Sequence, residues 1–160
     1  MRLTLTPGLN SSMGRFRSAT EPDVEAIVEM MRRYYGEDGY PFVDAESRAA
    51  VGALLRDERL GRLWVAQAGG RVVGYLAVTL GYSLEYRGRD AFIDELFISE
   101  EARGRGLGRE ALEVAEAYCR QVGVKALHLE VERHREPARE LYRRAGFEDR
   151  DRYLMTKRLG

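Results

Sequence analysis

The chain has little of what disulfide scaffolds, metal sites and membrane spans require. Its 160 residues include one cysteine, Cys119, and two histidines, His128 and His134, neither of which has zinc-site spacing to other ligands. No apolar run approaches the roughly 18 residues of a membrane span, and residues 1–14 lack the apolar core of a signal peptide. We therefore expect no metal, no internal disulfide, no membrane association and a cytoplasmic location, with residues 1–14 forming a flexible tail.

An excess of charge of one sign is also missing. Lys plus Arg and Asp plus Glu both total 26, so the formal net charge is zero. A general nucleic-acid binder needs a basic face, so this class is disfavoured. Apolar residues make up 44% of the chain, which is ordinary for a globular protein. Residues 15–160 are enough for a single domain with one core, in which Cys119 is expected to be a buried structural thiol.

Hydrophobic periodicity predicts a mixed α/β domain without internal repeats. A Gly69-Gly70 pair predicts a hairpin turn, and residues 34–42, with four aromatics, are interpreted as a loop. Helices are expected after Thr20, over 45–56, over 108–122 and from Pro137 to Ala145. Strands are expected at 15–18, 63–66, 72–78, 91–98 and 126–131, with a closing strand region that begins at Phe147 and includes 153–156.

A glycine-rich run, Arg103-Gly104-Arg105-Gly106-Leu107-Gly108, joins the strand predicted at 91–98 to the next helix. Glycines leave backbone N–H groups unobstructed, and a helix N-terminus adds unpaired donors and partial positive charge. This combination is typical of a phosphate or pyrophosphate site; the alternative is a flexible turn with solvated arginines. The spacing fits neither a P-loop nor the dinucleotide-binding Gly-x-Gly-x-x-Gly pattern.

Two motifs then suggest a family. Arg103, Gly106 and Gly108 form Arg-x-x-Gly-x-Gly after the predicted strand, and a second motif comprises Leu129-Glu130-Val131, Ala138, Leu141-Tyr142 and Gly146-Phe147. With these motifs, over roughly residues 15–157, the chain resembles the GNAT superfamily of N-acetyltransferases. The family often has Asn where this chain has Arg135, and Arg135-Glu136-Pro137 resembles the Asn-Glu-Pro of its polyamine acetyltransferases.

The resemblance implies the fold and the acetyl donor. It implies a mixed, mostly antiparallel sheet flanked by helices, in which the fourth and fifth strands splay apart, and acetyl-CoA as the donor. The pantetheine arm is expected to pair with the backbone of Leu96, Phe97 and Ile98. The pyrophosphate is expected at the turn formed by Arg103, Gly104, Arg105, Gly106, Leu107, Gly108 and Arg109.

For catalysis, the resemblance assigns Tyr142 as the acid that protonates the departing thiolate. Three carboxylates are candidates for the base: Asp94 and Glu95, which are unusual in an apolar strand, and Glu130. Strand alternation points Asp94 and Glu95 to opposite faces, unless a bulge changes the phase. For each of the three, the alternative is an ion-paired structural acid.

The acceptor is expected to be a small cationic amine. Acids near the predicted site, Glu37, Asp38 and Glu85 among them, would attract a cation, and aromatics that include Tyr35 would add cation–π contacts. The alternative is a set of solvated charges and core aromatics. A protein or peptide N-acetyltransferase and a non-catalytic acyl-CoA sensor stay open as functions, and the family makes a homodimer an expectation.

Overall fold

The computed structural model describes residues 14–160, which form two compact units, one ending at Glu130 and the other running from Val131 to Gly160. The first unit contains strands β1 (Phe16–Ser18), β2 (Gly61–Ala68), β3 (Arg71–Ser83), β4 (Gly88–Ile98) and β5 (Ala126–Leu129). Its helices are α1 (Val24–Asp38), α2 (Asp44–Arg56) and α3 (Leu107–Gln121), with short 3₁₀ turns at Glu21–Asp23 and Glu100–Ala102. The second unit contains α4 (Glu136–Arg144). The single domain over 15–160 stays a prediction.

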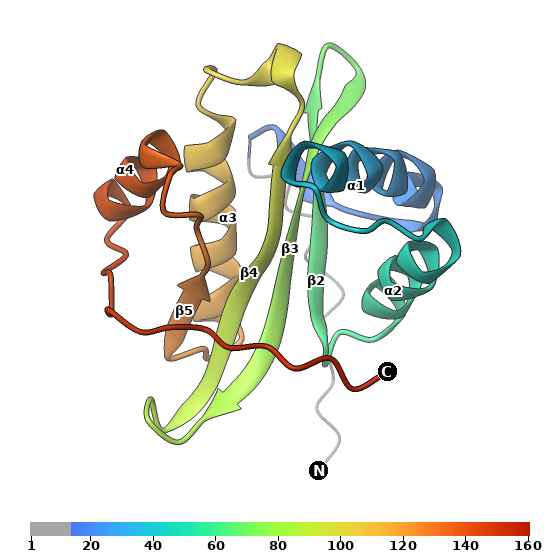
Figure 1. The fold of residues 1–160 in the computed structure, drawn as a ribbon. Helices are drawn as coiled ribbons and strands as arrows, with labels where there is room; N and C mark the ends of the chain where they lie inside the picture. The colour runs from blue at the N-terminus through green and yellow to red at the C-terminus, as the bar shows by residue number, and fades with distance from the viewer. Residues whose placement is uncertain (1–13) are drawn as a thin grey trace. The chain divides into compact units, whose positions relative to one another are not determined.

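The five strands form one sheet in the order β1-β2-β3-β4-β5 (Figure 1). All neighbours are antiparallel except β4 and β5, which are parallel. The mixed, mostly antiparallel sheet expected from the sequence is therefore confirmed. The β4–β5 pairing ends at Ile93 and Leu129, whereas β4 continues to Ile98. The last part of β4 thus extends beyond its parallel neighbour, in line with the expected divergence of strands four and five.

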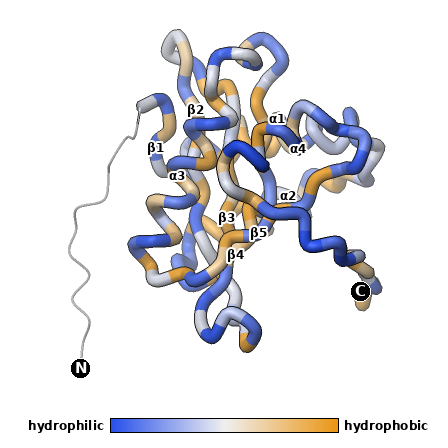
Figure 2. Tube along the Cα trace, turned by 90° about the vertical axis from the view of Figure 1, so that its left-hand side faces the viewer, coloured by the Kyte–Doolittle hydropathy of each residue, from blue (hydrophilic) through white to orange (hydrophobic). Residues whose placement is uncertain are grey.

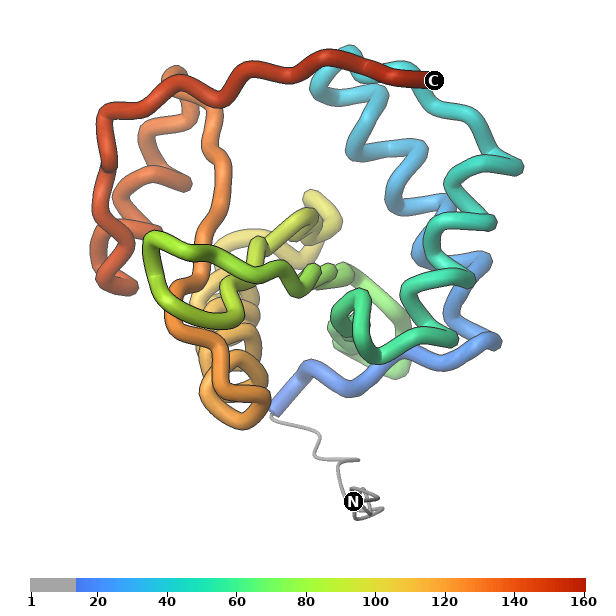
Figure 3. Tube along the Cα trace, turned by 90° about the horizontal axis from the view of Figure 1, so that it is seen from below, coloured from blue at the N-terminus to red at the C-terminus, as the bar shows by residue number. Residues whose placement is uncertain are grey.

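Helices α1 and α2 cover one face of this sheet and α3 lies on the other, as Figures 1 and 3 show. The first face is built from alternate strand residues such as Leu63, Val65 and Tyr75, which pack against Ile27 and Val28 of α1. On the second face, the Trp64 and Tyr118 rings meet edge to face at 5.1 Å. Figure 2 shows the hydrophobic residues following the central strands. The sheet is therefore packed between two buried layers.

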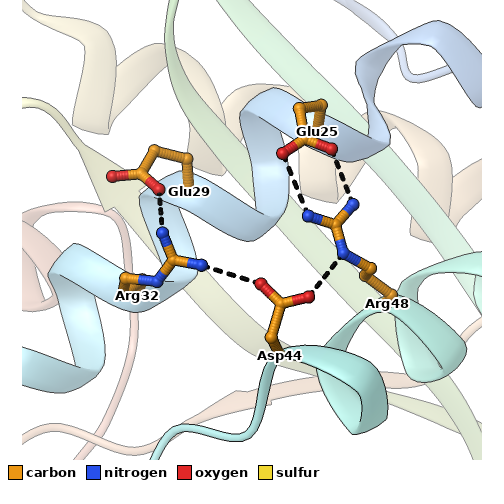
Figure 4. A network of polar contacts seen from close by, with 5 residues as sticks. All are labelled: Glu25, Glu29, Arg32, Asp44 and Arg48. Atoms are coloured by element: carbon orange, nitrogen blue, oxygen red, sulfur yellow. Dashed lines mark hydrogen bonds and ion pairs between the residues drawn. The ribbon is translucent and has the colours of Figure 1, made fainter.

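A network of ion pairs joins α1 to α2 along their solvent side (Figure 4). Arg48 contacts Glu25 (2.6 Å) and Asp44 (2.6 Å), and Arg32 reaches Asp44 (2.7 Å) and Glu29 (2.5 Å). Hydrogen bonds from Arg48 lower the pKa of both Glu25 and Asp44. The network adds to the buried contact between the two helices, in which Val51 of α2 shares a core with Ile27 and Val28 of α1.

Three expectations need correction. Residues 34–38 continue α1 instead of forming a loop, and the helix ends at Gly39 in the left-handed region (φ +71°), where Tyr40 N–H donates to the Tyr35 carbonyl. The fifth strand ends at Leu129, not at 131. The closing strand from Phe147 is wrong for the described residues, because 147–160 contain no strand. A strand exists only through pairing with a neighbour, and apolar sequence alone does not supply one.

Within 14–160, no helix is long and apolar enough to cross a bilayer.

Candidate active site

The glycine run forms an open turn at the start of α3. Gly104 (φ +74°) and Gly106 (φ +81°) both lie in the left-handed region, which favours glycine, and Gly106 is the N-cap of α3. A Cβ added at Gly104 would meet no atom within 4 Å, and one at Gly106 would meet only Arg15 Nη2, at 3.7 Å. The backbone at this turn is therefore accessible, and the first N–H groups of a 15-residue helix follow it. This geometry fits a phosphate group.

The last part of β4 presents backbone groups on the side where β5 has ended. Ser99 N–H donates to the Val73 carbonyl of β3 (2.8 Å). In an antiparallel pair the backbone N–H and C=O groups of successive residues alternate in direction, so those of Phe97 also point toward β3, whereas those of Leu96 and Ile98 point away from it. Phe97 instead contributes its ring to the core under α1. Of the three residues expected to pair with pantetheine, Leu96 and Ile98 are therefore the two that direct polar groups outward.

Arg103 lies at the junction of β4 and the turn. Its Nε donates to the outward carbonyl of Ile98 (2.8 Å), its Nη2 contacts Glu37 (3.2 Å), and its guanidinium lies over the Phe97 ring at 5.8 Å. These contacts tie the end of β4 to the end of α1. Arg105 and Arg109 are exposed at the turn, and the Nε of Arg109 pairs with Glu113 (2.9 Å). A role for these arginines toward CoA stays a prediction.

Glu95 is the acid that the fold encloses. Tyr35 donates a hydrogen bond from its hydroxyl to Oε1 of Glu95, and Tyr75 donates to Oε2 (2.9 Å). Tyr75 is 1% exposed. Burial raises the pKa of Glu95 and the nearby Asp94 adds to this, while the two tyrosine hydroxyls oppose it. The result is a carboxylate held in one orientation by α1 and β3, with a pKa above the ordinary value.

Tyr75 was not among the residues expected at the site. Its position in an apolar strand resembles that of any core aromatic, and only the register that places it near Glu95 shows its role. Tyr35 was expected at the site as a substrate contact, and this role stays a prediction. Its hydroxyl donates to Glu95, and burial together with this contact raises the pKa of Tyr35.

Asp94 and Glu130 occupy different surroundings from Glu95. The β3–β4 register passes from Ala77–Glu95 to Val78–Ile93, so Asp94 is the extra residue of a β-bulge. Its side chain is exposed, although the surrounding protein desolvates the carboxyl enough to raise its pKa. Glu130 is exposed and follows Leu129, the last β5 residue paired with β4. Asp94 and Glu130 thus both lie one residue beyond the last parallel pair.

Aromatic side chains gather around Tyr35 at the end of α1. Tyr40 and Phe42 meet the Tyr35 ring edge-on at 6.2 Å and 6.1 Å, and Tyr34 lies 5.8 Å from it. This arrangement brings an aromatic cluster to the Glu95 carboxylate. Among the other acids expected here, Glu37 pairs with Arg103, and Asp38 ends α1 half-buried.

Glu85 is not brought together with these acids. It lies in the turn between β3 and β4, before β4 begins at Gly88. Glu95 is seven residues further along the strand, and a strand rises about 3.3 Å per residue, so roughly 20 Å or more separates the two acids. Glu85 therefore belongs to the far end of the hairpin.

Tyr142 lies on α4, in the second unit. It is half-buried, its ring meets Phe147 edge-on at 6.1 Å, and Phe147 N–H donates to its carbonyl (3.0 Å). Burial raises the pKa of the Tyr142 phenol, and Arg135 offsets part of this. The phenol therefore stays protonated well above neutral pH, as an acid that donates to a thiolate must.

The remaining reactive side chain, Cys119, is buried, as expected. Burial raises the pKa of its thiol to about 11, so it is a poor nucleophile. Over residues 14–160, no three His, Cys, Asp or Glu side chains are grouped as a metal site requires.

The fold thus places an open glycine turn between strand β4 and helix α3. A family model described as Acetyltransferase (GNAT) family matches residues 24–147. The match spans most of the chain, so the chain belongs to this family, and the resemblance seen in the sequence is confirmed.

Two relatives have been named only by family. An uncharacterized N-acetyltransferase of Bacillus subtilis is 32% identical over 133 residues, which are 83% of this chain and 89% of the relative. An uncharacterized N-acetyltransferase of Methanocaldococcus jannaschii is 28% identical over 138 residues, or 84% of this chain, but these cover only 61% of the relative. The chain thus spans less than two thirds of that archaeal protein.

Solved structures with the same fold include an integron cassette protein from the mobile metagenome of Cole Harbour Salt Marsh. It has a TM-score of 0.82 and 37% identity, with 91% of each chain covered. A predicted acetyltransferase from Clostridium acetobutylicum, solved with acetyl-CoA, has a TM-score of 0.76 and covers 89% of this chain and 94% of its own. At 19% identity it supports the fold alone.

Proposed function

We propose that this chain transfers the acetyl group of acetyl-CoA to a primary amine by direct attack in a ternary complex, and that the acceptor is a small cationic amine. The observation that carries the proposal is the glycine turn. Gly104 and Gly106 leave its backbone open at the N-terminus of α3, and the strand that leads to this turn, β4, extends beyond its parallel neighbour β5. A phosphate on this turn and an extended arm along β4 match the two parts of a CoA molecule.

Binding is assigned to backbone groups and to helix α3. The N–H groups from Gly104 to Arg109 would hold the pyrophosphate, with the partial positive charge of the helix N-terminus. The outward backbone groups of Leu96 and the outward N–H of Ile98 would pair with the pantetheine arm as a neighbouring strand does, while the Ile98 carbonyl accepts from Arg103. When bound, acetyl-CoA supplies the activated acetyl thioester.

Proton transfer is assigned to two side chains. Glu95 would accept the proton of the attacking amine, directly or through a water molecule, because its carboxylate is oriented and burial raises its pKa above the ordinary value, which makes it a better base. Tyr142 would donate a proton to the departing sulfur. Asp94 and Glu130 remain the alternatives to Glu95, and both are more exposed.

The preference for a cationic amine is inferred from the end of α1. Aromatic rings beside a carboxylate attract an ammonium group both by cation–π contact and by charge. Tyr35 contacts Glu95 through its hydroxyl, and Tyr40 and Phe42 pack against the Tyr35 ring. A cytoplasmic location and a homodimer remain expectations of the sequence alone.

The experiment that tests the function is thiol release from acetyl-CoA across a panel of polyamines, aminoglycosides, simple amines and peptide N-termini. We expect turnover with at least one small cationic amine. Turnover with peptides alone would favour the protein N-acetyltransferase. Binding of CoA without turnover of any acceptor would identify an acyl-CoA sensor and refute the enzyme.

Replacing Gly106 with valine is expected to raise the KM for acetyl-CoA about 10- to 100-fold, because a β-branched residue cannot keep φ near +81° and one or two hydrogen bonds to a charged phosphate are lost. Gly123→Val is the matched control. Gly123 follows the other end of α3 at φ +76°, with no atom within 4 Å of an added Cβ. Unchanged acetyl-CoA kinetics in a folded Gly106→Val protein would rule out this turn as the phosphate site.

A further inference from the structure

The glycine turn is tied to the first strand of the sheet by Arg15. Arg15 Nη2 donates to the carbonyl oxygen of Arg105 (2.8 Å), and Arg15 Nε donates to Oε2 of Glu110 (3.0 Å). The backbone N–H of Arg15 donates to Oε1 of the same carboxylate. A Cβ on Gly14 (φ +59°) would overlap that carboxylate. The segment before β1 therefore packs closely around the first turn of α3.

The bond to the Arg105 carbonyl determines where the next N–H group points. In a trans peptide, the C=O and the following N–H point in opposite directions. Because the Arg105 carbonyl is directed at Arg15, the N–H of Gly106 is directed away from it. This N–H is one of the unpaired donors at the start of α3 that are assigned to the pyrophosphate. Arg15 thus orients the Gly106 N–H without occupying the space into which this N–H points.

The bond to Glu110 has an electrostatic consequence. Glu110 lies in the first turn of α3, where a carboxylate is stabilised by the helix dipole but repels a phosphate bound at the same helix end. A guanidinium is always charged, and that of Arg15 is held against this carboxylate. The pair removes most of a repulsion that would otherwise weaken an anion at this turn.

We propose that Arg15 is a positioning residue for CoA binding, which fixes the Arg105–Gly106 peptide and neutralises Glu110 beside the pyrophosphate. The inference rests on the proposed function, since it concerns the same turn. It adds a residue that lies outside both sequence motifs and comes from the opposite end of the chain. Its effect acts through Arg105 and Glu110 and not by contact with the reacting atoms.

The test is calorimetric titration of CoA into the whole chain, together with KM and kcat for acetyl-CoA. Arg15→Ala is expected to raise the Kd of CoA and the KM for acetyl-CoA about tenfold, which corresponds to the loss of one hydrogen bond of the charged kind. At saturating acetyl-CoA, kcat and the KM for the amine are expected to stay the same. For Arg15→Lys, the Kd of CoA is expected to lie between those of the unaltered chain and Arg15→Ala. One ammonium group can pair with Glu110 but cannot also donate to the Arg105 carbonyl as the forked guanidinium does.

A double-variant cycle separates the two effects. If the repulsion from Glu110 matters, adding Glu110→Gln to Arg15→Ala restores part of the affinity for CoA, while Glu110→Gln alone changes it little.

Arg48→Ala is the matched control: it also removes an arginine that pairs with carboxylates, but on the α1–α2 side of the sheet. We expect it to leave the Kd of CoA unchanged.

The outcomes distinguish this inference from the proposed function. If Gly106→Val weakens CoA binding and Arg15→Ala does not, the inference is overturned and the CoA site stands. If Arg15→Ala lowers kcat and the Kd of CoA is unchanged, Arg15 is not a CoA-positioning residue. If the unaltered chain does not bind CoA, both are refuted. Melting temperatures of Arg15→Ala, Arg15→Lys and Glu110→Gln show whether any loss comes from unfolding.

Discussion

Replacing Glu95 with glutamine is expected to lower kcat by about 10²- to 10⁴-fold, the usual contribution of a positioned acid or base. Glutamine has the same shape and keeps one carbonyl oxygen that accepts a hydrogen bond from Tyr35 or Tyr75. The remaining tyrosine hydroxyl must then accept instead of donate, which both hydroxyls are able to do. The loss is therefore expected in the chemical step and not in the KM for acetyl-CoA.

The pH dependence gives the same residue a second test. A base must be ionised to act, so kcat/KM of the unaltered chain should fall as the pH drops through the pKa of Glu95. Because burial raises this pKa, the fall should begin above the ordinary range of a glutamic acid. In Glu95→Gln this limb should disappear, leaving only the dependence that the amine's own ionisation imposes on both proteins.

Asp94→Asn and Glu130→Gln are the matched controls, because both acids lie near the end of the β4–β5 pairing and both are exposed. We expect each to keep most of the kcat. A large loss in either of them, with Glu95→Gln near the activity of the unaltered chain, would transfer the base to that residue. Glu95 would then be a half-buried acid that only holds Tyr35 and Tyr75 in place.

The elements that surround the site are those that local sequence predicts well. The glycine turn, the strand before it and α3 after it were predictable because a glycine run between an apolar stretch and a helical period has a local cause. Gly69-Gly70 predicted its hairpin in the same way, and both residues have positive φ. Helix α1 was predicted too short, because residues 34–42 were interpreted as a loop, whereas the helix continues to Asp38 and ends at Gly39.

The contacts that hold the site were not predictable, because each joins residues far apart in the chain. Arg15 and Glu110 are 95 positions apart, and Tyr35 and Glu95 are 60 apart. The bulge at Asp94 is also invisible in the sequence, since it depends on the register with β3. The bulge places Ile93 and Glu95 on opposite faces of the sheet. The strand can therefore carry both Asp94, which is exposed, and Glu95, which packs against Tyr35 and Tyr75.

Replacing Tyr142 with phenylalanine is expected to lower kcat by about 10²- to 10⁴-fold while the affinity for acetyl-CoA changes little. The substitution keeps the ring that packs edge-on against Phe147 and removes only the hydroxyl. Activity above background should remain, because holding amine and thioester together supplies effective molarities of about 10⁵ M or more without any acid. The measurement is kcat and KM for both substrates, with the melting temperature as a check of folding.

The leaving group separates an acid from a packing residue. If Tyr142 protonates the departing sulfur, an acetyl thioester whose thiol is more acidic needs less protonation, and the loss on Tyr142→Phe should shrink with it. A residue that only packs would cause the same loss with every thioester. Phe147→Leu is the matched control: it disturbs the same ring contact and leaves the hydroxyl, so it should not show this dependence. If a folded Tyr142→Phe protein keeps the full kcat while chemistry limits the rate, the proton must come from another group or from water.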